Sequence, residues 1–117
     1  MATIKAFTDI PQSKKLAEFL PPESADVIWD LTNPNLPTIR AIPYEDSDYN
    51  NKYLNIIPAW SLAALLSVLP NGIVMNKDSQ NGRYHFSSKY IGTYVTADNP
   101  VDACYKLILK LNELNLL

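Results

Sequence analysis

The sequence predicts an α+β fold, a two-layer sandwich of one antiparallel sheet with about four to five strands and about three helices. Apolar residues recur at helical spacing near residues 10–20, 58–69 and 99–115. The stretches between them alternate apolar and polar residues and are joined by short turns, which favours antiparallel strands. We therefore expect the helices to lie largely on one face of the sheet, within a single domain formed by residues 1–117.

Composition narrows the classes of function. Twelve acidic and ten basic residues give a formal net charge of −2, and no basic patch is evident, so nucleic-acid binding is not expected. One cysteine and one histidine exclude an internal disulfide and a zinc site built from Cys and His within one chain. No apolar run is long enough to span a membrane or to form a signal peptide, so we expect a cytoplasmic protein.

The first helix is expected to begin at Asp9, because Asp9 and Gln12 have the spacing of a capping box. Pro21 and Pro22 should end it, since neither can donate a backbone hydrogen bond. Its inward stripe would be Leu16, Ala17 and Leu20.

Residues 25–31 and 38–43 are predicted to form a hairpin, in which Val27 and Trp29 share one face of the first strand. The polar segment 45–51 follows as an exposed loop. Its alternating acidic residues resemble the start of a calcium-binding loop, but Asn51 stands where that loop needs Gly, and Ile57 where it needs Glu. We therefore expect no metal there.

The second helix is predicted over residues 58–69, with Pro58 in its first turn and Trp60 on one apolar face. Because it is apolar nearly all round, it should be buried on two sides, by the sheet and by another helix or a second subunit. Strands are then expected near 73–75, 83–89 and 91–97, with a hairpin turn at Asn81-Gly82.

The last helix, near 99–115, has the clearest local signal. Asn99 is a favourable N-cap, and Pro100 follows it where a missing N–H costs nothing. Asp102 lies in the first turn, at the positive end of the helix dipole. Cys104 lies beside the apolar face, and we interpret it as a structural thiol rather than a nucleophile.

Candidate site residues are few, and none is assigned a catalytic, cofactor-binding or metal-binding role. His85, the only histidine, is expected to face away from Tyr84 and Phe86, and no orienting carboxylate can be assigned to it from the sequence. Exposed aromatic residues are typical of protein interfaces, although half-buried aromatics at strand edges would look the same. The residues considered for an interface or pocket are Trp60, His85, Tyr94, Tyr44, Tyr49 and Tyr53.

Three blocks, residues 12–18 with 22–26, 59–66, and 97–105, together resemble a group of small uncharacterised proteins of gut bacteria and of their phages and mobile elements. The resemblance implies a cytoplasmic protein encoded by a prophage or mobile element, and it implies no activity, cofactor or site residue. The strand region near 73–95 is shorter here than in that group.

The absence of a catalytic motif and the surplus of apolar helix surface lead us to expect a non-enzymatic interaction module that binds a protein partner or self-associates. The alternative is a small-molecule or enzymatic site in a cleft between sheet and helices, near Trp60 and His85.

Overall fold

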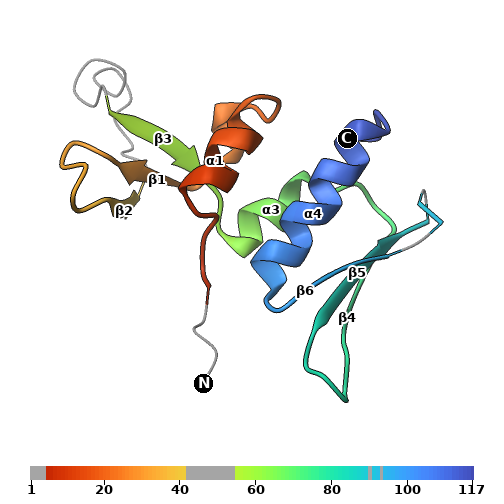
Figure 1. The fold of residues 1–117 in the computed structure, drawn as a ribbon. Coiled ribbons are helices and arrows are strands. Elements are labelled where there is room, and N and C mark those ends of the chain that lie inside the picture. The colour runs from red at the N-terminus through yellow and green to blue at the C-terminus, as the bar shows by residue number, and fades with distance from the viewer. Residues whose placement is uncertain (1–4, 42–54, 90, 93) are drawn as a thin grey trace.

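The computed structural model describes residues 5–41, 55–89, 91–92 and 94–117. Three α-helices, a short 3₁₀ turn and six strands occur in these ranges (Figure 1). Their order is α1 (Ile10–Ala17), the 3₁₀ turn (Pro22–Ser24), β1 (Val27–Asp30), β2 (Thr38–Ala41), β3 (Ile56–Ala59), α3 (Leu62–Val68), β4 (Ile73–Lys77), β5 (Tyr84–Ser88), β6 (Tyr94–Ala97) and α4 (Pro100–Glu113).

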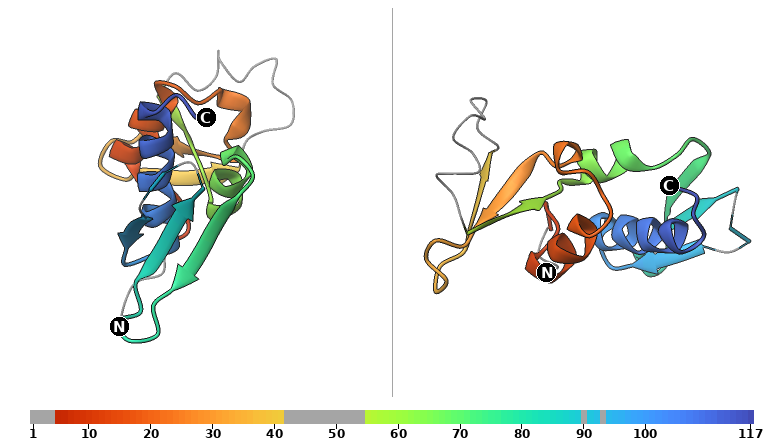
Figure 2. Two further views of the ribbon diagram at one scale, coloured as in Figure 1. Left: turned by 90° about the vertical axis from the view of Figure 1, so that its right-hand side faces the viewer. Right: turned by 90° about the horizontal axis from the view of Figure 1, so that it is seen from above.

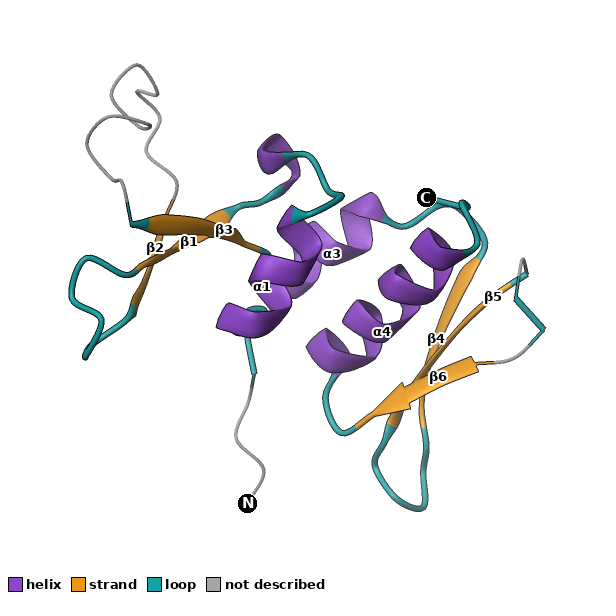
Figure 3. Ribbon diagram, turned by 45° about the horizontal axis from the view of Figure 1, so that its top comes forward, coloured by secondary structure: helices purple, strands orange, loops and turns teal. Residues whose placement is uncertain are grey.

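The α+β class is confirmed, but the prediction of one sheet is wrong. The described strands form two separate three-stranded antiparallel sheets, with orders β2-β1-β3 and β4-β5-β6. The helices lie between the two sheets (Figures 1 and 3), so the expected two-layer arrangement is not formed. β3 pairs with the side of β1 that β2 leaves free, so β1 has no side left for a later strand. The chain then enters α3, which packs against α4.

The predicted helix over 58–69 is wrong in its first turn. Residues Ile56–Ala59 instead form β3, in which Pro58 pairs with Ile28 of β1. Pro58 is tolerated because β3 is an edge strand, where a missing N–H need not break the ladder. The helix starts after Ser61, whose hydroxyl accepts a hydrogen bond from the Ala64 N–H at 3.2 Å.

The predicted caps of the other two helices are confirmed. Asp9 and Gln12 form the complete capping box of α1, although the helix ends at Ala17, which is exposed rather than inward. The Asn99 side chain accepts a hydrogen bond from the Asp102 N–H at 2.8 Å and begins α4.

Helix α4 is the centre of the hydrophobic core. Its inward face packs on β5 and β6 and also on α3, and Cys104, Leu107, Ile108 and Leu111 are fully buried. The same cluster includes Leu16 of α1 and extends to Phe86 of β5. Figure 2 shows α4 along the second sheet, with the first sheet at the far end of the molecule.

A buried polar junction at Thr8 joins α1 to the first sheet. The Thr8 N–H donates to the Trp60 carbonyl at 2.9 Å, and Thr8 Oγ1 accepts from the Trp60 N–H at 3.1 Å. The Thr8 carbonyl accepts from the indole of Trp29 at 2.9 Å, and its hydroxyl bonds Ser13 Oγ at 2.8 Å. These bonds satisfy polar groups that would be costly to bury alone.

Candidate interaction surface on the second sheet

The two faces of the second sheet have opposite environments. Side chains alternate across a strand, so Tyr84, Phe86 and Ser88 turn toward the helices while their neighbours turn outward. Val74 pairs with Ser87 and Asn76 with His85, and Tyr94 of β6 pairs with Ser87 from the other side. We name this outward set the outer sheet face, defined by Val74, Asn76, His85, Ser87 and Tyr94.

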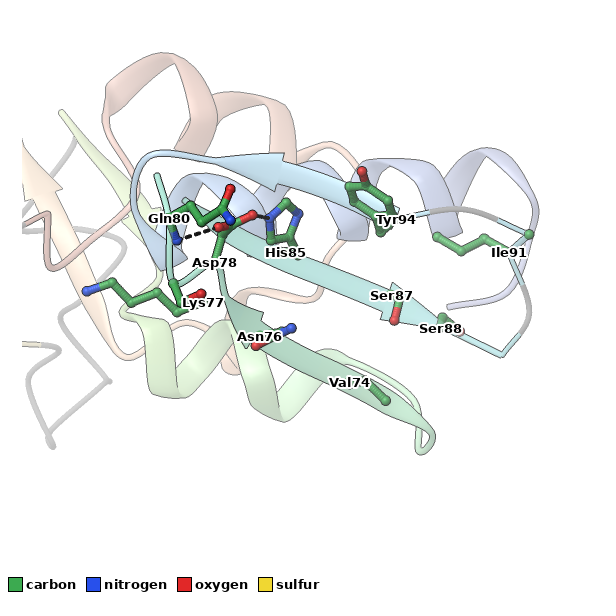
Figure 4. Close-up of a pocket in the computed structure, with 12 residues that line it drawn as sticks. Val74, Asn76, Lys77, Asp78, Gln80, His85, Ser87, Ser88, Ile91 and Tyr94 are labelled. Carbon is green, nitrogen blue, oxygen red and sulfur yellow. Dashed lines mark hydrogen bonds and ion pairs between the residues drawn. The ribbon is translucent and has the colours of Figure 1, made fainter. Parts of the chain in front are cut away.

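Two contacts fix His85 on this face. Its Nε2 lies 3.5 Å from Oδ2 of Asp78, and its ring meets that of Tyr94 edge to face with centroids 5.0 Å apart (Figure 4). Asp78 begins the turn after β4, where Oδ1 accepts the backbone N–H groups of Gln80 at 2.7 Å and Asn81 at 3.3 Å. These backbone bonds, with a smaller contribution from His85, lower the pKa of Asp78.

The outer sheet face forms the floor of a broad trough of about 1030 Å³. Val74 and Tyr94 are 61% and 57% exposed, so its apolar groups face solvent directly. Figure 4 shows the labelled side chains spread along the strands rather than gathered around one point. The volume of the trough, about 1030 Å³, lies just above the ~300–1,000 Å³ usual for small-molecule pockets. The shape therefore suits an extended surface better than a small ligand held on all sides.

The predicted site residues separate into three groups. His85 and Tyr94 are brought together on the outer sheet face. Trp60 is not with them: it is fully buried in the core, and its indole N–H donates to Ser24 Oγ at 3.0 Å. With no exposed surface, Trp60 does not line the trough that His85 lines. The third group lies outside the described residues and consists of Tyr44, Tyr49 and Tyr53. The acidic loop 45–51 lies outside them as well.

Sequence reasoning missed Asp78, the carboxylate beside His85, and the exposed Val74. The sequence predicts only a hairpin turn at Asn81-Gly82 in this region, and the place of Asp78 beside His85 follows from the pairing of Asn76 with His85. The signal that could have found it is the hairpin itself. A strand ending at Lys77 and another starting at Tyr84 put Asp78 next to the strand that carries the histidine.

Within residues 5–41, 55–89, 91–92 and 94–117, no group of three His, Cys, Asp or Glu side chains could hold a metal ion. In the same part of the chain, no helix combines the length and the apolar character needed to cross a bilayer. Comparison with protein-family models, with curated proteins and with solved structures finds no match for this chain. The surface therefore has to be interpreted from its own chemistry.

Cys104 offers a direct check on the core beneath this sheet. Burial raises the pKa of its thiol to about 12, so almost no thiolate forms at neutral pH in the folded protein. We expect an aromatic disulfide reagent to label Cys104 only as fast as the protein opens, and immediately in denaturant. Rapid stoichiometric labelling of the native protein, followed by absorbance, would contradict the structural role of this thiol.

Proposed function

We propose that this protein is a non-enzymatic interaction module that binds a protein partner through the outer sheet face. The observation that carries the proposal is the exposure of Val74 and Tyr94 at the floor of a trough, on the side of the sheet opposite α4. Burying an exposed aliphatic side chain and an exposed aromatic side chain against a partner would contribute favourable free energy to binding.

The surroundings of these two residues fit a protein interface. Asn76, Ser87 and Gln80 supply hydrogen-bonding groups around the apolar pair, and Asp78 adds one fixed negative charge. An apolar centre with a polar rim is the usual anatomy of such interfaces. A nucleic-acid partner is disfavoured, because the chain carries a formal charge of −2 and phosphate neutralisation dominates such affinities.

The resemblance noted in three blocks of sequence supports a cellular setting for the module. On that basis the partner would be a cytoplasmic protein, and the module would serve a phage or mobile element in an accessory role. The cytoplasmic partner and the accessory role do not depend on the geometry of the outer sheet face. Either of them can be wrong without affecting the proposal that this face binds a protein.

The surface is tested by replacing its two apolar residues. Tyr94→Ala and Val74→Asp should each weaken binding of a purified partner by about thirtyfold, the effect of losing an interface hot spot. Both side chains are exposed, so folding should be little affected. Leu36→Asp is the matched control, since Leu36 is 65% exposed on the β1–β2 connection of the other sheet. Equal affinities in calorimetry for all four proteins would refute the proposal.

The second candidate is a small-molecule or enzymatic site, now confined to His85, Asp78 and Tyr94. The ion-pair geometry of Asp78 and His85 favours it, because a carboxylate that orients an imidazole is a common acid–base arrangement. This candidate predicts that His85→Gln abolishes turnover or ligand binding while Val74→Asp leaves both nearly unchanged. The interaction proposal predicts the reverse order: Val74→Asp should weaken partner binding more than His85→Gln does.

A further inference from the structure

Within the described residues, the outer edge of β4 differs from the outer edges of β3 and β6. β3 carries Pro58 and packs against α1, and on β6 Lys106 Nζ donates to the Thr96 carbonyl at 2.9 Å. Natural edge strands are commonly protected in such ways against pairing with another chain. β4 runs for five residues without a proline, and Val74 to Lys77 are all exposed.

The hairpin shows which residues of β4 form their backbone hydrogen bonds toward β5 and which point away from it. We call this alternation the hydrogen-bond phase of β4. The Asp78 N–H donates to the Arg83 carbonyl at 2.7 Å, which makes Asp78 and Arg83 a hydrogen-bonded pair. Such pairs alternate along an antiparallel ladder, so Val74 and Asn76 also bond toward β5. The N–H and C=O groups of Ile73, Met75 and Lys77 consequently point away from β5. We name these three residues the β4 edge.

The opposite edge confirms this phase independently. If Val74 and Asn76 bond to Ser87 and His85, then β5 must bond β6 through Tyr84 and Phe86. The carbonyl of Thr96 then points outward from β6. That is where Lys106 binds it.

From this phase we infer that the β4 edge pairs antiparallel with the β4 edge of a second copy of the chain. The outward groups are spaced symmetrically about Met75, so a two-fold axis there would place Met75 opposite Met75 and Ile73 opposite Lys77. Every outward N–H and C=O of the β4 edge then finds a partner, because these are all hydrogen-bonded positions. No like charges are opposed, since Lys77 faces an isoleucine.

The flanks of the β4 edge favour a second copy over an unrelated peptide. Met75 is 52% exposed and lies beside a groove of about 360 Å³ that Leu66 and Leu69 of α3 help to line. In the two-fold arrangement each Met75 lies next to the groove of the other copy, and methionine adapts well to such irregular apolar gaps. The two sheets would join into one continuous sheet with both outer sheet faces on the same side, giving two binding surfaces per dimer.

The pairing is tested by reversing charge at the symmetric position. Wild-type protein should be dimeric by light scattering at high micromolar concentration. Met75→Lys alone and Met75→Glu alone should each dimerise at least about tenfold more weakly, because like charges then lie directly opposite. An equal mixture of the two variants should form heterodimers. Leu36→Lys and Leu36→Glu serve as matched controls on the first sheet and should remain as dimeric as wild type.

Amide hydrogen exchange tests the register without mutation. The amides of Ile73, Met75 and Lys77 should become protected as concentration rises, whereas those of Val74 and Asn76 should be protected throughout. A wild-type protein that stays monomeric, a dimer insensitive to charge at Met75, or protection confined to β6 would each overturn the inference. None of these outcomes bears on partner binding by the outer sheet face. The dimer can therefore be refuted without refuting the proposed function, and the reverse is also true.

Discussion

Trp60→Ala should lower the free energy of unfolding by about 3–5 kcal/mol, the range for removing a large buried aromatic side chain. Trp60 has no exposed surface and lies between β3 and α3, where its backbone bonds Thr8 and its indole bonds Ser24. Small domains are stable by only about 5–15 kcal/mol, so this variant should be at the limit of folding at room temperature. Urea denaturation followed by circular dichroism measures the loss.

Two matched variants separate packing from hydrogen bonding at this position. Trp60→Phe keeps most of the buried ring but removes the indole N–H, and it should lose distinctly less stability than Trp60→Ala. Trp29→Phe removes the indole N–H that donates to the Thr8 carbonyl. The ring of Trp29 is only half-buried, so this variant should cost less again. A Trp60→Ala protein as stable as wild type would show that Trp60 does not support the core as described.

The second large effect is expected at Asp102, where the N-terminal segment meets α4. Its carboxylate accepts hydrogen bonds from Lys5 Nζ at 2.7 Å, Gln12 Nε2 at 2.8 Å and Asn99 Nδ2 at 2.8 Å. Partial burial alone would raise the pKa of Asp102, but these bonds outweigh it and the pKa is lowered from its ordinary 3.8. Asp102→Asn should cost about 2 kcal/mol at neutral pH, typical of bonds to a charged group.

The sign of the pH dependence follows from the direction of this shift. A carboxylate with a lowered pKa in the folded state stabilises the protein above its ordinary pKa, and the stabilisation disappears as pH falls through the folded value. The stability difference between wild type and Asp102→Asn should therefore shrink as pH falls below about 3.8. Glu18→Gln, in the exposed pair with Lys15, is the control and should change little at any pH. A difference independent of pH would contradict the role of the charge.

The local features of the fold could be predicted from sequence because each depends on residues close along the chain. The Asp9–Gln12 capping box and the Asn99 cap are each set by side chains three residues from their partners. The β3 strand could not be found this way. Its apolar residues and Pro58 also fit the first turn of a helix, and what makes it a strand is pairing with β1, which is distant in sequence.

The candidate site was predictable only in part, for the same reason. The alternation of β5 indicated that His85 turns away from Phe86, and the structure places it so. The approach of Tyr94 depends on the pairing of β5 with β6, and the division into two sheets depends on which strand edges the helices cover. No local pattern encodes either of these. Trp60 and His85 were expected to share a cleft between the sheet and the helices, whereas Trp60 is fully buried and does not line the trough at His85.

The central claim, that the outer sheet face binds a protein partner, is tested most directly by site-specific photocrosslinking in cells that encode the protein. A photoreactive phenylalanine analogue replaces Tyr94 in one sample and Leu36 in another, both in a Met75→Lys background that suppresses adducts between two copies. Our account predicts a discrete adduct with one partner protein from position 94 and none from position 36. No adduct from position 94, or the same adducts from both positions, would contradict it.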